Sequence, residues 1–121
     1  MEIFRLFTFD AAHLLPNLPP GQKCGRMHGH TFHLGIYVEG PVGEESGWVM
    51  DFSAIKLLCR PVLEELDHSF LNDIPGLSNP TSENIAKWIW NHLKPVLPGL
   101  SMVEIKETPS SGCRYRGSEE S

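Results

Sequence analysis

Alternation of apolar and polar residues is the clearest pattern in the first third of the chain. Residues 28–39 place Phe32, Leu34, Ile36 and Val38 at every second position, between residues that are mostly polar or glycine. This period of two predicts a strand with one apolar face. Residues 2–10 read as an earlier strand. After the turn-rich residues 40–47, the run 48–52 (WVMDF) is expected to return antiparallel to 28–39 as a hairpin.

Apolar residues then recur every three or four positions, which is the period of a helix. A first helix is predicted from the apolar positions Ile55, Leu58, Cys59, Val62 and Leu66. Pro61 lies inside this run and is expected to kink the helix or to mark a restart. A second helix is predicted to begin near Thr81, whose hydroxyl can cap it, and to end before Pro95.

Two short runs near the end of the chain, 101–108 and 113–117, are predicted to be extended. The fold class that follows is α+β, with an antiparallel sheet and both helices packed on one face. A length of 121 residues suits a single domain, which we place at residues 1–117, and residues 118–121 are expected to fray as a charged tail.

Charge and cysteine usage narrow the class of protein. The net charge is −5, with fifteen carboxylates against ten lysines and arginines, and this argues against binding to nucleic acid. The first ten residues contain no unbroken apolar run, so neither a signal peptide nor a membrane span is readable. Three widely spaced cysteines do not suggest a disulfide framework. We therefore expect a cytoplasmic protein.

Histidines at the start of the second strand form a candidate metal site. His28 and His30 are two residues apart, so they project from the same face of a strand at a separation of about 7 Å. His13, at the end of the first strand, is the best third ligand. Three imidazoles and one open position describe a catalytic zinc site. Cys24 leaves two alternatives open, because it is either a fourth ligand of a closed structural site or a thiolate beside the metal.

A second candidate group is Asp67 with His68, at the end of the first predicted helix. No apolar period explains these two residues. They are either a helix cap with a solvated side chain or a proton relay, in which an aspartate orients a histidine that exchanges a proton with Cys24.

Five motifs in order resemble the 6-pyruvoyltetrahydropterin synthase family, and within it the 6-carboxytetrahydropterin synthases of queuosine (7-deazapurine) biosynthesis. The motifs are FDAAH (9–13), CGRMHGH (24–30), LDHSFLND (66–73), NPTSENIAKWIW (79–90) and EIKET (104–108). The likeness runs from Phe7 to Gly117. The three-residue spacing between Cys24 and His28 resembles the queuosine branch.

The resemblance implies a role for each matching residue. It makes His13, His28 and His30 the zinc ligands, Cys24 the catalytic thiol, and Asp67 with His68 the partners that set the protonation state of that thiol. It assigns Glu107 to the 2-amino and N3 edge of a pterin, for which a carboxylate is well shaped, and places Thr81 and Ser82 along the pterin pocket. Lys23 and Arg26 bracket Cys24, and we expect these cations to hold a triphosphate.

The resemblance also implies a fold, an assembly and a reaction. The fold is the tunnelling fold, in which subunits join their sheets into a barrel and active sites lie between subunits of a homo-oligomer. The implied reaction is the zinc-dependent conversion of 7,8-dihydroneopterin triphosphate to 6-carboxy-5,6,7,8-tetrahydropterin, acetaldehyde and triphosphate. Two alternatives stay open: a 6-pyruvoyltetrahydropterin synthase, which eliminates triphosphate but keeps the three-carbon side chain, and a zinc-stapled interaction module without catalysis.

Overall fold

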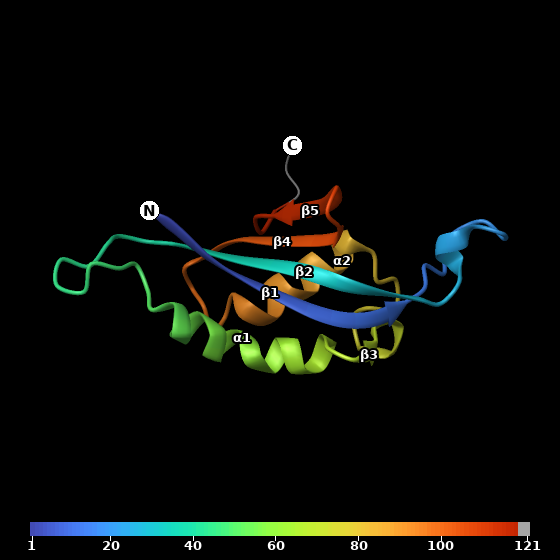
Figure 1. Cartoon of the computed structure of the whole chain (residues 1–121), viewed down its shortest axis with the longest axis horizontal. Coiled ribbons are helices and arrows are strands. Elements are labelled where there is room, and N and C mark those ends of the chain that lie inside the picture. The colour runs from blue at the N-terminus through green and yellow to red at the C-terminus, as the bar shows by residue number, and fades with distance from the viewer. Residues whose placement is uncertain (119–121) are drawn as a thin grey trace.

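The structure, a computed structural model, describes residues 1–118, apart from the side chain of Cys24. Most of the predicted tail, residues 119–121, therefore lies outside the described residues. The elements in chain order are β1 (Glu2–His13), η1 (Lys23–Gly25), β2 (His28–Glu39), α1 (Phe52–Leu66), β3 (Ser69–Phe70), η2 (Leu71–Asp73), α2 (Ser82–Leu93), β4 (Leu100–Thr108) and β5 (Ser111–Tyr115) (Figure 1).

One five-stranded sheet, in the order β3-β1-β2-β4-β5, organises the molecule. The four longer strands pair antiparallel, as predicted. The two-residue strand β3 is parallel to β1, pairing Ala11 with Ser69, so the sheet as a whole is mixed. Both helices cover the same face of the sheet, and the other face carries no helix of residues 1–118 (Figure 1).

The hairpin predicted at residues 48–52 is wrong. Residues 48–51 lie in a loop in which the Gly43 backbone N–H donates to the carbonyl of Trp48 at 2.9 Å, and Phe52 already begins α1. The carboxylate of Asp51 accepts a hydrogen bond from the Ser53 N–H at 2.9 Å and so caps the helix. Val49 and Met50 pack against the core from this loop, so burial explains their apolar character without a strand.

The helices follow their sequence patterns, with one difference. α1 is a single helix across Pro61, so the chain does not restart there. Ile55 and Cys59 before the proline, and Val62 and Leu66 after it, are all buried, and this continuous stripe fixes both halves against the sheet. α2 begins as predicted, because the Thr81 hydroxyl accepts a hydrogen bond from the Asn84 N–H at 3.1 Å.

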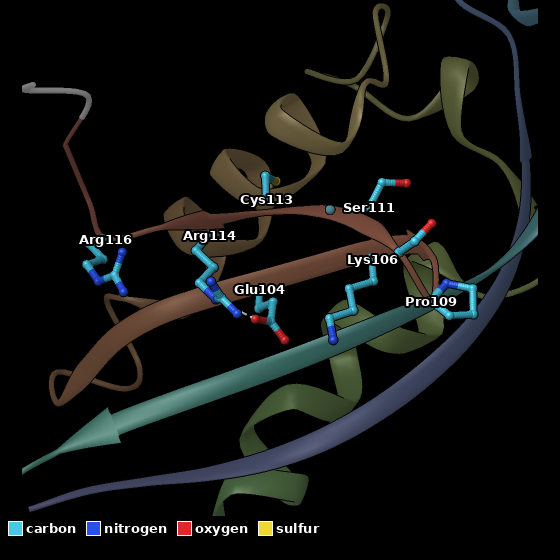
Figure 2. Close-up of a pocket in the computed structure, with 9 residues that line it drawn as sticks. Glu104, Lys106, Pro109, Ser111, Cys113, Arg114 and Arg116 are labelled. Atoms are coloured by element: carbon cyan, nitrogen blue, oxygen red, sulfur yellow. Dashed lines mark hydrogen bonds and ion pairs between the residues drawn. The ribbon is translucent and has the colours of Figure 1, made fainter.

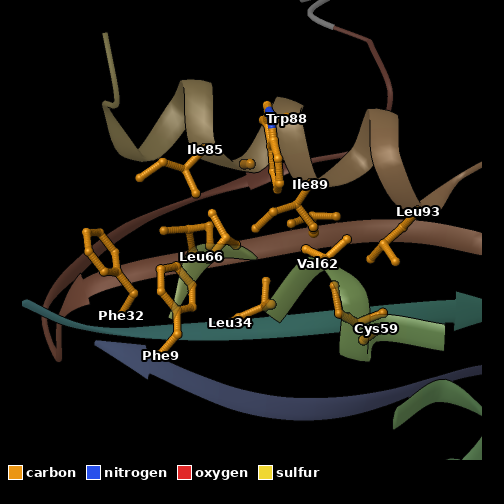
Figure 3. Close-up of a cluster of buried hydrophobic side chains, with 14 of the residues drawn as sticks. Phe9, Phe32, Leu34, Cys59, Val62, Leu66, Ile85, Trp88, Ile89 and Leu93 are labelled. Carbon is orange, nitrogen blue, oxygen red and sulfur yellow. The ribbon is translucent and has the colours of Figure 1, made fainter. Parts of the chain in front are cut away.

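The core lies between the helices and one face of the sheet (Figure 3). Phe9 of β1 stacks on Phe32 of β2 with ring centroids 5.0 Å apart. The opposite face is open, and Leu6 on it is 62% exposed. Neither α1 nor α2, the two α-helices in the described part of the chain, is long and apolar enough to cross a membrane.

Candidate active site

Three histidines converge at the end of the sheet where β1 stops and β2 starts. The antiparallel register sets His13 opposite His28 and Ala11 opposite His30. Because His28 and His30 are two residues apart, both side chains take the helix-covered face that His13 also occupies. The three rings lie with centroids 4.6 to 5.2 Å apart, and one nitrogen from each lies within 4.8 Å of the others. The predicted convergence of these residues is therefore present.

Backbone carbonyls fix the tautomers of two of these rings. His13 Nδ1 lies 2.8 Å from the carbonyl oxygen of Pro80, and His28 Nδ1 lies 2.7 Å from that of Arg26. A carbonyl only accepts, so each neutral ring carries its proton on Nδ1 and presents a lone pair at Nε2. This is the usual arrangement of a metal-ligating histidine with an outer-shell partner.

The nitrogens that face the centre of the cluster have no hydrogen bond. His13 Nε2 and His30 Nε2 are both buried, and neither has a partner among the described atoms. Buried polar atoms normally find a partner, and an orphaned pair at one point indicates that something binds there. Three imidazole nitrogens within 4.8 Å of one another fit a transition-metal ion such as Zn²⁺.

Burial also affects the protonation state of His13. Its side chain is only 1% exposed, and desolvation lowers its pKa below the ordinary histidine value. The hydrogen bond to Pro80 and the charge of Glu107 act in the opposite direction but are smaller. The ring is therefore neutral at neutral pH, which is the form that ligates a metal.

Glu107 lies beside the histidine cluster. One carboxylate oxygen is 3.9 Å from His30 Nε2, and the other accepts a hydrogen bond from the Ser82 hydroxyl at 2.8 Å. β4 supplies the glutamate, and the first residue of α2 supplies the serine that orients it. Thr81 is adjacent, but its hydroxyl accepts from the α2 backbone and is occupied as a cap.

The segment before β2 carries three further predicted residues. Lys23 and Cys24 belong to the short 3-10 helix η1, and Arg26 follows it. Lys23 and Arg26 are exposed. The side chain of Cys24 lies outside the described part of the structure, so its predicted place near the metal remains a prediction.

Asp67 and His68 form a second cluster at the end of α1. The Asp67 carboxylate accepts from the Asp10 N–H at 2.9 Å and lies 2.9 Å from His68 Nδ1. These two hydrogen bonds, that from Asp10 first, hold the pKa of Asp67 below its usual range. His68 adopts a positive φ of 57°, and its N–H donates to the Asp10 carbonyl at 2.6 Å.

Asp10 is a member of this second cluster that the sequence patterns did not identify. Its carboxylate accepts from the Thr31 hydroxyl at 2.5 Å, and it lies within 4.8 Å of ligand atoms of Asp67 and His68. Asp10 and His13 are three residues apart on β1, so their side chains project from opposite faces of the sheet. Within residues 1–118, the group of Asp10, Asp67 and His68, hereafter the relay, is thus separate from the histidine cluster. A hollow of about 520 Å³ nevertheless borders both His30 and His68.

The chain is similar to known proteins over most of its length. The family model for 6-pyruvoyl tetrahydropterin synthase matches residues 2–118. The chain is 45% identical to the 6-carboxy-5,6,7,8-tetrahydropterin synthase of Synechocystis, over 93% of this chain and 91% of that protein. It is 44% identical to the dihydroneopterin monophosphate aldolase of Pyrococcus furiosus, over 76% of this chain and 74% of that protein.

A solved structure shows the same fold. The 6-pyruvoyl tetrahydropterin synthase of Caenorhabditis elegans superposes with a TM-score of 0.90 at 31% identity, covering 98% of this chain and 96% of that one. The predicted α+β tunnelling fold of the subunit is confirmed by this match. The chain belongs to the 6-pyruvoyl tetrahydropterin synthase family.

Proposed function

We propose that this protein is a zinc-dependent lyase that converts 7,8-dihydroneopterin triphosphate and water to 6-carboxy-5,6,7,8-tetrahydropterin, acetaldehyde and triphosphate, as a step of queuosine (7-deazapurine) biosynthesis. The observation that carries this proposal is the 45% identity, over nearly the whole chain, to a 6-carboxy-5,6,7,8-tetrahydropterin synthase. The pterin ring gains the two electrons that the side chain loses, so no redox cofactor is needed.

His13, His28 and His30 would hold the zinc. The unpartnered Nε2 atoms of His13 and His30, and the Nδ1 protons committed to backbone carbonyls at His13 and His28, support this assignment. Three histidines leave a fourth position open for substrate oxygens, whose pKa a bound zinc ion lowers.

The chain's own residues bind the ring and move protons. Glu107, oriented by Ser82, accepts hydrogen bonds from the 2-amino and N3 edge of the pterin. Cys24 exchanges a proton at the carbon that joins the side chain to the ring. Asp67 accepts the Nδ1 proton of His68, which leaves His68 Nε2 as the atom that exchanges protons with Cys24 or the substrate.

We further propose that the active unit is a homo-oligomer with sites between subunits. Asp10 and His13 project from opposite faces of β1, and the relay and the histidine cluster of one chain form two separate groups, so a second copy would place its relay beside each zinc site. The sheet also ends in unpaired strand edges, at β5 and along residues 2–9 of β1, which another copy would cover.

Product analysis tests the proposal. The zinc-loaded protein is incubated with 7,8-dihydroneopterin triphosphate, acetaldehyde is measured with alcohol dehydrogenase and NADH, and the pterin is identified by mass spectrometry. Stoichiometric acetaldehyde and 6-carboxytetrahydropterin support the proposal. A pterin that keeps a diketo side chain supports the 6-pyruvoyl alternative, which the match to the Caenorhabditis elegans structure favours.

Two further outcomes would replace the proposed reaction. Turnover of the monophosphate alone, with cleavage of the side chain but no reduction of the ring, would indicate an aldolase like the Pyrococcus furiosus relative. Firmly held zinc with no turnover of either substrate would indicate the interaction module.

A further inference from the structure

A hollow of about 440 Å³ lies on the β4–β5 hairpin, and no histidine lines it (Figure 2). Glu104, Lys106 and Arg114 project from the same face of the hairpin, while Cys113 points to the helix layer (Figure 2). The remaining lining residues are Pro109, Ser110, Ser111, Gly112 and Arg116. The hollow therefore opens on the face of the sheet that no helix covers.

Positive charge dominates this hollow. Its one carboxylate, Glu104, is nearly buried and is bound to Arg114 Nε at 2.6 Å, so these two charges compensate each other. Lys106 and Arg116 have no ion pair with any residue of the described chain. Within residues 1–118, two cations without an ion pair thus face one cavity, in a protein whose net charge is −5.

The hairpin that lines the hollow requires glycine at one position. Gly112 pairs with Lys106 across the hairpin, and an added Cβ there would collide with the carbonyl oxygen of Ile105. A second hollow of about 480 Å³ shares Glu104, Lys106 and Pro109 and continues across the sheet to β1. His33 pairs with Lys106 in the register of β2 and β4 and lines this second hollow.

This hollow is distinct from the candidate active site. Lys106 and Glu107 are neighbours on β4, so their side chains take opposite faces of the sheet. Glu107 faces the helices and the histidine cluster, and Lys106 faces the open side.

We propose that the open-face hollow is a second anion site, which binds oligophosphates through Lys106 and Arg116. An ammonium and a guanidinium are the side-chain groups best suited to phosphate oxygens, and a concave site strengthens their field. A cavity of this size holds a chain of phosphates and not only one. The inference does not depend on the proposed reaction, because binding is measured without turnover.

Calorimetric titration of the full chain with inorganic triphosphate, at low ionic strength, tests the inference. The Lys106→Ala/Arg116→Ala double variant is expected to lose at least about 10-fold in affinity at one class of site. A matched control, Lys56→Ala/Arg60→Ala, removes the same charge from α1 and is expected to change affinity by less than about 2-fold. Parallel titrations with ATP and with single phosphate distinguish a nucleotide, a free oligophosphate and a simple anion as the bound species.

Three results would overturn the inference: no binding of triphosphate by the unaltered chain, equal losses in both double variants, or a loss confined to Lys23→Ala/Arg26→Ala. Glu104→Gln provides a test in the other direction, and it does not depend on the double variant folding. It removes the carboxylate that compensates Arg114, so affinity should rise several-fold. Unchanged or weaker binding by this variant, with an unaltered melting temperature, also contradicts the inference.

Discussion

The two groups of titratable side chains near the end of β1 have opposite hydrogen-bonding states. In the histidine cluster, the outer nitrogens of His13 and His28 are committed to backbone carbonyls, while inner nitrogens are buried without partners. In the relay of Asp10, Asp67 and His68, each side chain already has a partner and the histidine side chain is 79% exposed. Both groups contain enough donor atoms for a metal.

We infer that this difference distinguishes a metal-binding site from a group that relays protons. A cluster with unsatisfied, desolvated lone pairs gains free energy when a cation binds. A cluster whose side chains are already hydrogen-bonded, and whose histidine is exposed to water, gains less free energy from the same cation. We therefore expect the metal at the histidine cluster alone, and the following predictions test that contrast.

Removal of one histidine should have the largest effect. His30→Ala leaves two imidazoles, and zinc affinity should fall by more than the roughly 10 to 100-fold that loss of an outer-shell partner causes. Elemental analysis after dialysis measures zinc per chain, and turnover should fall with it. His33→Ala, which changes a histidine on the opposite face, is the matched control and should keep about one zinc. Equal zinc retention by both variants would place the metal elsewhere.

Loss of the thiol should remove turnover and leave the metal. Cys24→Ala is expected to keep about one zinc per chain and a folded oligomer, while turnover falls by about 10²-fold or more, because a proton-transfer group is lost. Zinc content and rate are measured on the same sample. If Cys24→Ala sheds zinc as His30→Ala does, the thiol is a ligand and the closed structural site becomes the better account.

A change in the relay should lower turnover and leave the zinc content unchanged, as predicted for Cys24→Ala. Asp67→Asn keeps an oxygen that accepts from the Asp10 N–H but loses the charge that faces His68. Turnover should decrease by about 10²-fold with no change in zinc content. A loss of zinc from Asp67→Asn would mean that the relay is itself a metal site.

A change at Glu107 should act on substrate binding. Glu107→Gln replaces the carboxylate that we propose as the acceptor for the pterin edge, and it should weaken binding by about 2 to 4 kcal/mol, with zinc unchanged. Ser82→Ala removes the hydrogen bond from the Ser82 hydroxyl to this carboxylate and should cost only about 0.5 to 1.5 kcal/mol. Fluorescence titration with a pterin measures both, and unaltered affinity in Glu107→Gln would remove this residue from the pocket.

The smallest predicted effect is the pH dependence of stability in metal-free protein. Burial lowers the pKa of His13, so the unfolded chain takes up this proton first as the pH falls. The free energy of unfolding should therefore decrease below about pH 6.5, by at most about 1.4 kcal/mol per pH unit, until the folded protein is also protonated. Denaturant titrations across this range measure the slope. His13→Gln should show a shallower slope, and an unchanged slope would contradict the assignment.

Sequence patterns predicted the parts of the fold that depend on local periodicity. Alternation in residues 28–39 indicates which residues share a face of the strand, and this was sufficient to predict that His28 and His30 lie together. The prediction of a hairpin at 48–52 was wrong because five apolar-rich residues fit either a strand or the start of a helix. The hydrogen bond from the Ser53 N–H to the Asp51 carboxylate caps the helix here. The pairing of β2 with β4 is non-local, and no short-range signal reports it.

The hydrogen bonds and tautomers of the site were less predictable from the sequence than the identity of its residues. The positions of His13, Asp67 and Glu107 could be proposed from motifs, but the tautomer of His13 depends on the carbonyl of Pro80, 67 residues away. Asp10 belongs to the relay because β1 lies against the end of α1, where the Asp10 N–H donates to the Asp67 carboxylate. Its one signal in the sequence, a polar residue on the open face of a strand, is shared by many solvated residues.

Zinc titration of metal-free protein tests the central claim most directly. Protein stripped with a chelator is reconstituted in steps with zinc, and acetaldehyde release from 7,8-dihydroneopterin triphosphate is recorded at each step. We predict no release without zinc, a linear rise to one zinc per chain, and no further increase beyond that ratio. Full turnover by the metal-free protein, or zinc binding at one per chain with no acetaldehyde at any ratio, would contradict the account.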